Sequence, residues 1–583
     1  MTNPTGPRPS TSSPMKRYGP IAAIVVVLVV IAGVVVLSGG DDSTSDSAQT
    51  TGTTGTGDGS AAAAVPITYD QAKADGTEAD TTWVANCDPE PGHIKIPTVY
   101  SPPCVPAFEG DNGGATSQGV TADSIKVVYY VAQQNADALA ALAGATDDPE
   151  LARQTVADYT TMLQDLFETY GRTVEIERYD ATGPATDAVA AQADATSIIE
   201  KEPFAVINGP GPPAYAEEMA RAGIICISCG AAVPDDNYQK NAPYMWGQGP
   251  STEQYLGNFA DFIQYRVLGH KAEFAGDPAM QQQDRVIGSV NFDQDPPVFA
   301  VIRQRILDCG GTLGYEPKVS EVYQFDMGKM PDRAATIIAK MKAEGVTTVI
   351  FLGDPIMPIY LTQQATAQDY HPEWVIAGTA LTDTTALARR YDQTQWAHAF
   401  GLSNLSARTP RELAGSYQLH EWYFGRPPTA INTNGILLPP LNQLFLGIHM
   451  AGPDLTVETF KEGLFNYPTS GGGPTTPQIS YGTETGFTMY GPNCEPDVPR
   501  PDFLTTNDTT EIWWDAEATG VDEQGKEGKG MWTYANNGTR YGPGEMPRTP
   551  TDAFKRENTV TLFAEVPPED QAPDYPSPAA GGQ

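Results

Sequence analysis

Residues 124–131 read SIKVVYYV, a short apolar run that is rich in β-branched and aromatic side chains. Such a run predicts a buried β-strand. Asp148 and Pro149 follow and predict the start of a helix, because Asp caps a first turn and Pro fits its first position. Apolar residues then recur every three or four positions as far as Gly171. The pattern predicts a strand followed by an amphipathic helix, which is the repeating unit of a parallel α/β sheet.

The same alternation of strand and helix continues along the chain in two series. Six further short apolar runs are expected to be strands, and they lie at 174–176, 204–207, 224–227, 285–290, 346–352 and 374–377. Helical patterns separate these runs, so each series predicts parallel strands joined by right-handed crossovers. Each series is long enough to form a sheet of its own. The sequence therefore predicts two α/β lobes.

The composition indicates which kinds of partner the protein is not expected to bind. The chain has 583 residues, which is enough for two domains with extensions. Its 72 acidic residues outnumber 35 Lys and Arg, and the formal net charge is -37. A surface with this charge repels phosphate backbones, so nucleic-acid binding is not expected.

The N-terminal region contains one uninterrupted apolar run, IAAIVVVLVVIAGVVVL, at 21–37. As a helix it spans about 26 Å, slightly less than a hydrocarbon core of ~30 Å. Basic residues precede the run and acidic residues follow it, which by the positive-inside rule predicts an exported body. We therefore expect a cytoplasmic tail at 1–20 and a single-pass membrane anchor at 21–38. A cleaved signal peptide is the alternative.

Changes in composition divide the remainder of the chain into six expected parts. They are a disordered linker at 39–82, a Cys-containing extension at 83–119, three segments at 120–248, 249–405 and 406–470, and a C-terminal extension at 471–583 with a disordered end. The linker is expected because Ser, Thr, Gly and Asp cannot bury enough apolar surface to fold.

Six cysteines are compatible with three disulfides outside the cytoplasm. Cys87 and Cys104 are candidate disulfide partners, since a bridge there would stabilise an extension that lacks a core. Cys226 and Cys229 have the spacing of a redox pair, but Cys226 lies within an apolar strand instead of opening a helix. A structural role is therefore favoured, and a place for Cys229 in a ligand wall is left open. The cysteine spacing and the six His argue against a structural zinc site.

Motifs for catalysis are missing from the sequence. It has no GxSxG nucleophile elbow, no GxxxxGK[ST] phosphate loop and no HExxH zinc motif. None of the six His lies beside a plausible Ser or Cys nucleophile. We therefore expect neither an enzyme nor a cofactor, and we name no catalytic or metal-binding residue.

Seven stretches taken together, in their order and spacing, point to one family. They are VTADSIKVV (120–128), YDA (179–181), SIIEKEPFAVINGP (197–210), AEEMARAGIICIS (216–228), YMWGQG (244–249), RVIGSVNFDQD (285–295) and LFLGIHMAGPDLTVETF (444–460). Over about 119–467 the chain resembles the type I periplasmic solute-binding proteins, in particular the branch of the leucine/isoleucine/valine-binding protein that serves ABC importers.

The resemblance implies both a fold and a function. The fold would be two Rossmann-like lobes joined by a three-strand hinge, and the lobes would close on a small molecule. The resemblance implies that 120–248 and 406–470 are the two parts of lobe 1, that 249–405 is lobe 2, and that the C-terminal extension returns to lobe 2. The partners would be an amino acid, an amide or another small polar or aromatic solute, and the permease subunits of an ABC transporter. Amino-acid transport is thus one implied process. A membrane-anchored ligand sensor or cell-envelope interaction protein on the same fold is the alternative.

The resemblance also implies ligand-binding residues at strand ends and in the hinge. Carried over residue by residue, they are Tyr130, Gln133, Gln134, Gly209, Pro210, Gly211, Ser228, Cys229, Trp246, Gln248, Asn291, Asp293, Gly353, Asp354, Thr379 and Asp383. In the amino-acid binders of this family an acidic residue of the second lobe holds the α-ammonium group, and Asp354 or Asp383 would serve here. Gly-Pro-Gly-Pro-Pro at 209–213 replaces an expected hydroxyl, which puts an α-amino acid in doubt.

Overall fold

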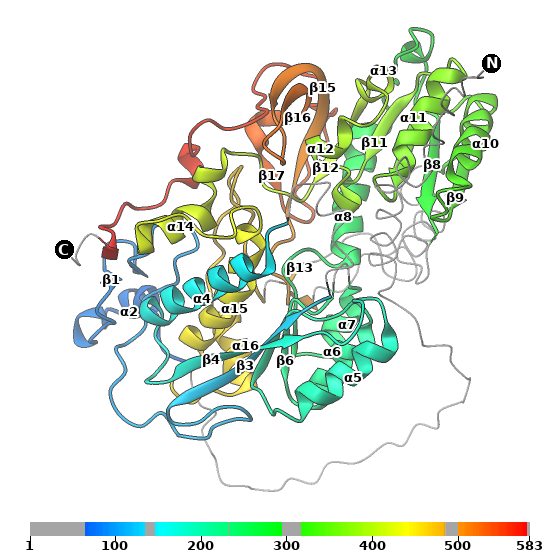
Figure 1. Ribbon diagram of the computed structural model, residues 1–583. Coiled ribbons are helices and arrows are strands. Elements are labelled where there is room, and N and C mark those ends of the chain that lie inside the picture. The colour runs from blue at the N-terminus through cyan, green and yellow to red at the C-terminus, as the bar shows by residue number, and fades with distance from the viewer. Residues whose placement is uncertain are drawn as a thin grey trace, which may run out of the picture.

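The computed structural model describes residues 65–133, 146–230, 233–293, 316–482, 484–485 and 500–579. The expected tail at 1–20, the expected anchor at 21–38 and the candidate Gln134 lie outside these residues. Within the described part of the chain, no helix is both long and apolar enough to cross a bilayer. Figure 1 shows two α/β lobes, which confirms the predicted fold class at this level.

Lobe 1 is built on a parallel five-stranded sheet with the order β4-β3-β5-β6-β7. The strands are β3 (Ser124–Val131), β4 (Thr173–Asp180), β5 (Ala205–Ile207), β6 (Ile225–Ile227) and β7 (Met245–Trp246). The helices of this lobe are α4 (Pro149–Leu166), α5 (Ala188–Ile199), α6 (Pro213–Arg221), α7 (Asp235–Lys240), α14 (Gly415–Phe424), α15 (Asn434–Ala451) and α16 (Val457–Phe465).

The first helix of lobe 1 begins and packs as its sequence predicts. The side chain of Asp148 accepts a hydrogen bond from the backbone N–H of Glu150, and Pro149 occupies the first turn. Tyr159 and Leu163, four positions apart, are buried on one face of α4. The apolar spacing therefore directs this helix onto the core of lobe 1.

Lobe 2 has a mixed sheet with the order β16-β15-β12-β11-β10-β8-β9, and β17 pairs with β15. Five strands are parallel, namely β8 (Ile287–Phe292), β9 (Val319–Tyr323), β10 (Thr348–Leu352), β11 (Glu373–Ile376) and β12 (Ala399–Ser403). Three C-terminal strands are antiparallel, namely β15 (Thr509–Val521), β16 (Glu527–Tyr534) and β17 (Arg540–Tyr541). Among the described residues, five helices accompany this sheet, namely α8 (Thr252–Phe262), α10 (Met330–Ala343), α11 (Met357–Ala367), α12 (Thr385–Ala388) and α13 (Gln393–Trp396).

Three segments of the described chain connect the sheet of one lobe to the sheet of the other. The first crossing follows β7, the second follows β12, and the third precedes β15 and contains the pair β13 (Glu484–Thr485) and β14 (Arg500–Pro501). The first and third crossings run in parallel at Gly247 and Leu504. Because β7 and β12 each leave their sheet at the carboxyl end and enter a crossing, the carboxyl edges of both sheets face the hinge.

Secondary structure in the N-terminal extension begins nearer the N-terminus than the sequence predicted. The expected linker at 39–82 is wrong from residue 65 onward, because α2 (Tyr69–Asp75) and a 3-10 turn (Glu78–Asp80) lie within it. Thr68 and Gln71 form a capping box at the start of α2. Local hydrogen bonding thus orders a segment whose composition alone indicated a linker.

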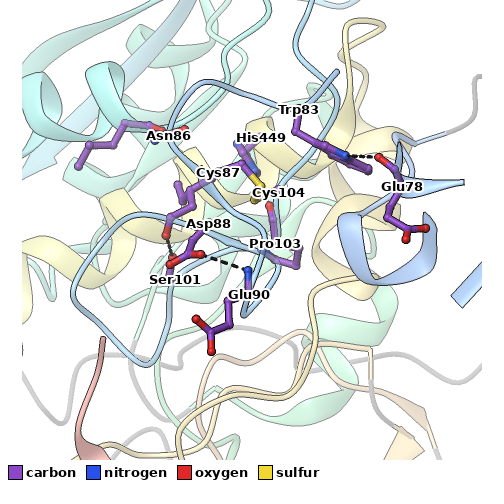
Figure 2. Close-up of a disulfide and its surroundings, with 12 residues drawn as sticks. Glu78, Trp83, Asn86, Cys87, Asp88, Glu90, Ser101, Pro103, Cys104 and His449 are labelled. Atoms are coloured by element: carbon purple, nitrogen blue, oxygen red, sulfur yellow. Dashed lines mark hydrogen bonds between the residues drawn. A yellow bond between two sulfur atoms is a disulfide. The ribbon is translucent and has the colours of Figure 1, made fainter. Parts of the chain in front are cut away.

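The candidate disulfide in the extension is present. Cys87 and Cys104 are bonded, and they lie next to the short pair β1 (Cys87–Asp88) and β2 (His93–Ile94) (Figure 2). His449 of α15 is fully buried beneath this bridge and bonds the carbonyl of Pro103 at 3.0 Å. The extension is therefore fastened to lobe 1.

The C-terminal extension returns to lobe 2 and then ends on lobe 1. The strands β15, β16 and β17 extend the second sheet. The expected disordered end, the last dozen residues, is wrong for 572–579: the indole N–H of Trp422 donates to the carbonyl of Tyr575 at 2.9 Å, and the Tyr575 hydroxyl donates to Asp88 at 2.9 Å. These contacts come from residues far apart in the sequence, so composition could not predict them.

Candidate functional site

Two loops of lobe 1 meet at the carboxyl edge of its sheet. Asn208 directly follows β5 and Ser228 directly follows β6, and both have a left-handed backbone with φ of 62°. A Cβ atom on Gly209 would lie 2.7 Å from the ring of Tyr215, so only glycine allows this close approach. Left-handed non-glycine residues are costly and concentrate where a fold holds a functional loop. The backbone N–H of Asn208 donates to the carbonyl of Ile227 at 2.8 Å, so the predicted positions Gly209 and Ser228 lie on neighbouring loops.

A second disulfide joins β6 to the loop that follows it. Cys226 and Cys229 are bonded, and both are buried. A Cβ on Gly209 would lie 3.4 Å from the Cβ of Cys229, so the bridge also touches the loop after β5. The favoured structural role of this pair agrees with its burial. Cys229 lies beside the loop that follows β5. Its place in a ligand wall stays a prediction.

Two first-lobe residues that were predicted to contact the ligand form hydrogen bonds within the protein. The Tyr130 hydroxyl donates to Asp194 of α5 at 2.9 Å, and Tyr130 is only 2% exposed. Burial, followed by this carboxylate, raises the pKa of Tyr130 above its usual range. Gln133 is exposed, and its amide donates to the carbonyl of Ala181 at 3.1 Å. Tyr130 is therefore corrected from a cleft contact to a core residue.

The hinge holds Trp246 and Gln248 in different surroundings. Trp246 is fully buried, its N–H donates to Pro243, and four aromatic rings surround it, namely Phe460, Phe465, Tyr481 and Phe503. It is corrected from a ligand contact to the core of the hinge. Gln248 is partly exposed and donates to Gln443 at 2.5 Å. Its own amide oxygen is buried without a partner among the described residues.

The structure distinguishes between the two acids proposed for the second lobe. Asp354 is 1% exposed, and one of its oxygens accepts the backbone N–H groups of Ile356 (2.7 Å) and Met357 (3.0 Å) at the start of α11. Its other oxygen accepts the Tyr323 hydroxyl. Burial raises the pKa of Asp354, opposed by these hydrogen bonds. Both oxygens of Asp354 are therefore engaged within the protein, one of them by backbone N–H groups at the start of α11.

Asp383 has an oxygen to spare. Its Oδ2 accepts the hydroxyl of Ser403, at the end of β12, at 2.6 Å. Its Oδ1 is buried and has no hydrogen-bond partner among the described residues, and the same holds for the hydroxyl of Tyr255. Burial raises the pKa of Asp383 to about 7. Burial, and after it the Asp383 charge, raises the pKa of Tyr255.

The loop that carries Asp383 is strained. Ala380 and Leu381 are consecutive non-glycine residues with φ of 49° and 66°. Thr379 anchors the loop to its neighbour, because its hydroxyl donates to the carbonyl of Gly353 at 3.0 Å. The two predicted positions Thr379 and Gly353 are thus brought together. No sequence pattern identified Ala380, Leu381 or Tyr255 as residues of the site. Asn208 could have been identified, because Asn is one of the few residue types that tolerate a left-handed backbone.

The remaining predicted residues lie at the same edges. Asn291 is 1% exposed; its amide donates to Ser289 and to the carbonyl of Glu321, and its oxygen has no partner among the described residues. Asp293 follows β8 and is half-buried. Pro210 is buried, and the N–H of Gly211 donates to Ala185 at 2.8 Å. In the part of the chain that the structure describes, no three His, Cys, Asp or Glu side chains are placed to hold a metal ion.

Comparisons with known proteins find similarity in solved structures only. No family model and no curated protein matches the sequence. One similar structure is a solute-binding protein of an ABC transporter from R. palustris in complex with 4-hydroxybenzoate, at 12% identity and a TM-score of 0.46, covering 70% of this chain and 97% of that one.

Two further similar structures come from other bacteria. The branched-chain amino acid transporter substrate-binding protein from Streptococcus pneumoniae, with isoleucine, has 12% identity and a TM-score of 0.42, and the match covers 71% of this chain and 100% of that one. The fatty acid ABC transporter substrate-binding protein from Thermomonospora curvata has 16% identity and a TM-score of 0.44, with 73% and 95% covered. All three are substrate-binding proteins of ABC transporters.

Proposed function

We propose that this protein is an extracytoplasmic solute-binding protein that captures a small molecule between its lobes and delivers it to an ABC importer. One observation carries the proposal: the parallel strands of the two sheets turn their carboxyl ends toward a hinge of three crossings. Open α/β sheets bind ligands at these edges. The left-handed loops at Asn208, Ser228, Ala380 and Leu381 lie there, which supports a site preformed from both lobes.

The proposed mechanism is binding without chemistry. A solute drives closure of the hinge only if it binds the closed state more tightly than the open state. We place the ligand contacts at Ser228, Gln248, Asp293, Thr379 and Asp383. The spare oxygen of Asp383 favours a ligand group that donates a hydrogen bond, because an unpaired buried carboxylate oxygen gains most from such a donor.

The test is ligand-dependent stabilisation of the full-length protein. Isoleucine, 4-hydroxybenzoate and a fatty acid form the starting panel, together with any solute that mass spectrometry finds in the purified protein. A solute at 100 times its Kd should add about 2.7 kcal/mol to the free energy of unfolding. Asp383→Asn should remove this shift. The matched control is Asp369→Asn, since Asp369 is an exposed loop carboxylate.

Two outcomes of this experiment would count against the proposal. If no solute stabilises the protein and none purifies with it, capture of a small molecule loses its support. If Asp383→Asn retains the full stabilisation while the fold is intact, the ligand does not use the second-lobe loop. Turnover of a bound solute would indicate an enzyme instead.

We also propose that residues 21–38 anchor the protein in the cell membrane with the two lobes outside the cytoplasm. The support is the apolar run with basic residues before it and acidic residues after it. Deleting the run should move the protein from the membrane fraction to the soluble fraction. Retention at the membrane after the deletion would refute the anchor. Cross-linking to permease subunits would test the transport partner.

A further inference from the structure

The turn of the β15–β16 hairpin forms hydrogen bonds with the second-lobe segment that follows β11. The register of the two strands shifts between Asp515 and Thr519, so the outer half of the hairpin departs from a regular ladder. Glu523 lies in the turn beyond this shift. Its two carboxylate oxygens accept the backbone N–H groups of Thr385 at 3.0 Å and Ala386 at 2.8 Å. These N–H groups belong to the first two residues of α12, two and three positions after Asp383.

Arg408 contacts the Glu523 carboxylate, Thr385 and the hairpin backbone at the same time. Its Nε lies 3.4 Å from a Glu523 oxygen, and another nitrogen donates to the Thr385 hydroxyl at 3.4 Å. A third nitrogen donates to the carbonyl of Val521 at 2.6 Å. The side chains of Arg408 and Glu523 are only 16% and 23% exposed. Arg408 belongs to the second crossing, so the carboxylate of Glu523 joins the loop, the hairpin and the hinge.

Arg389 holds the hairpin in place against lobe 2. Its guanidinium donates to four backbone carbonyls of the hairpin, those of Gly520, Lys526, Gly528 and Gly530, at 2.7 to 3.0 Å. It also pairs with Asp522 at 3.2 Å. A guanidinium that satisfies its donors in this way fixes the backbone around it. Arg389 therefore fixes the hairpin that carries Glu523.

We propose that Glu523 is a positioning residue of the ligand site, which holds the loop 378–386 in the conformation that binds a solute. The proposal rests on the proposed function, because Thr379 and Asp383 are the expected ligand contacts of this loop. Consecutive left-handed residues such as Ala380 and Leu381 persist only where surrounding contacts over-determine the backbone. The carboxylate of Glu523 supplies such contacts from outside the loop.

The charge of Glu523 acts on the same loop. Burial is the main cause of the raised pKa of Asp383, and the nearby Glu523 carboxylate raises it further. Replacing Glu523 with a neutral residue should therefore lower the pKa of Asp383. This electrostatic coupling adds the pKa of Asp383 as a second readout of the contact.

The test compares Glu523→Gln with Glu517→Gln in the full-length protein. Glu517 lies in the same hairpin, is 76% exposed and pairs with Lys529 at 2.8 Å, so it is a matched control. Hydrogen exchange followed by mass spectrometry should show at least tenfold faster exchange at Thr385 and Ala386 in Glu523→Gln only. Calorimetry with isoleucine and with 4-hydroxybenzoate should show at least a tenfold rise in Kd, and the midpoint of the pH dependence of binding should move to lower pH.

A second variant separates contact from charge. Glu523→Asp keeps the negative charge but is one carbon shorter, so we expect faster exchange at the two amides with the pH midpoint of the wild type. Unchanged exchange in Glu523→Gln would overturn the proposal, and so would faster exchange with an unchanged Kd. If neither probe binds any variant, that result counts against the proposed function for these solutes, while the exchange rates still decide whether Glu523 holds the loop.

Discussion

The contact between His449 and the N-terminal extension should make the protein sensitive to acid. His449 is fully buried. Its Nδ1 accepts the backbone N–H of Glu168 at 2.9 Å, and its Nε2 faces the carbonyl of Pro103 at 3.0 Å. These partners require the neutral ring with its proton on Nε2. Burial lowers the pKa of His449 from 6.5 to about 4, and the Pro103 carbonyl opposes this shift.

The size of the effect follows from this difference in pKa. Above pH 6.5 the ring is neutral in both states and does not alter the free energy of unfolding. As the pH falls below 6.5, the unfolded chain takes up the proton first, so the folded state loses stability. By pH 4 the loss from His449 should reach about 3 kcal/mol. This is a large fraction of the ~5–15 kcal/mol that holds a typical domain.

Urea unfolding of the wild type and of His449→Gln at pH 7.5, 6, 5 and 4 would measure this effect, since glutamine does not titrate. The difference in the free energy of unfolding between the two proteins should shrink by about 3 kcal/mol from pH 7.5 to pH 4. His270→Gln is the control, because His270 is only partly buried. A difference that stays constant with pH would refute the argument, and so would an NMR titration of His449 near pH 6.5.

Two further predictions concern backbone packing and the first disulfide. Gly209→Ala should destabilise the protein by about 1–3 kcal/mol in a thermal or urea melt, because the new Cβ would lie 2.7 Å from the buried ring of Tyr215. Gly249→Ala has open space around it and should change stability by less than ~0.5 kcal/mol; an equal effect of both variants would contradict the steric reason. Replacing both Cys87 and Cys104 with Ala should cost about 3 kcal/mol and speed proteolysis of the extension, and unaltered protease resistance would show that other contacts suffice.

Local sequence patterns were enough to predict the layers of both lobes. The runs expected at 204–207, 224–227 and 374–377 contain β5, β6 and most of β11. They could be predicted because burial on both faces of a parallel sheet demands a continuous apolar run. Their edges shifted by a residue or two, since strand ends depend on partners from other parts of the chain.

The functional side chains were predicted less well than the strands that carry them. Tyr130 and Asp354 stand at the expected strand ends, yet each is engaged by a residue distant in sequence. Asp194 accepts the Tyr130 hydroxyl across 64 positions, and Tyr323 reaches Asp354 across 31. A strand end determines where a residue lies, but its neighbours in space determine whether its polar atoms remain free for a ligand.

Composition and periodicity therefore decided the α/β class and the two series of strands, because burial and hydrogen bonding within each element are local demands. Tertiary structure alone decided that Asp383 keeps an unpaired oxygen while Asp354 does not. It also brought Glu523 to the N–H groups of Thr385 and Ala386 across more than a hundred residues. Such contacts depend on how the C-terminal hairpin packs on lobe 2, and no short window of sequence contains that information.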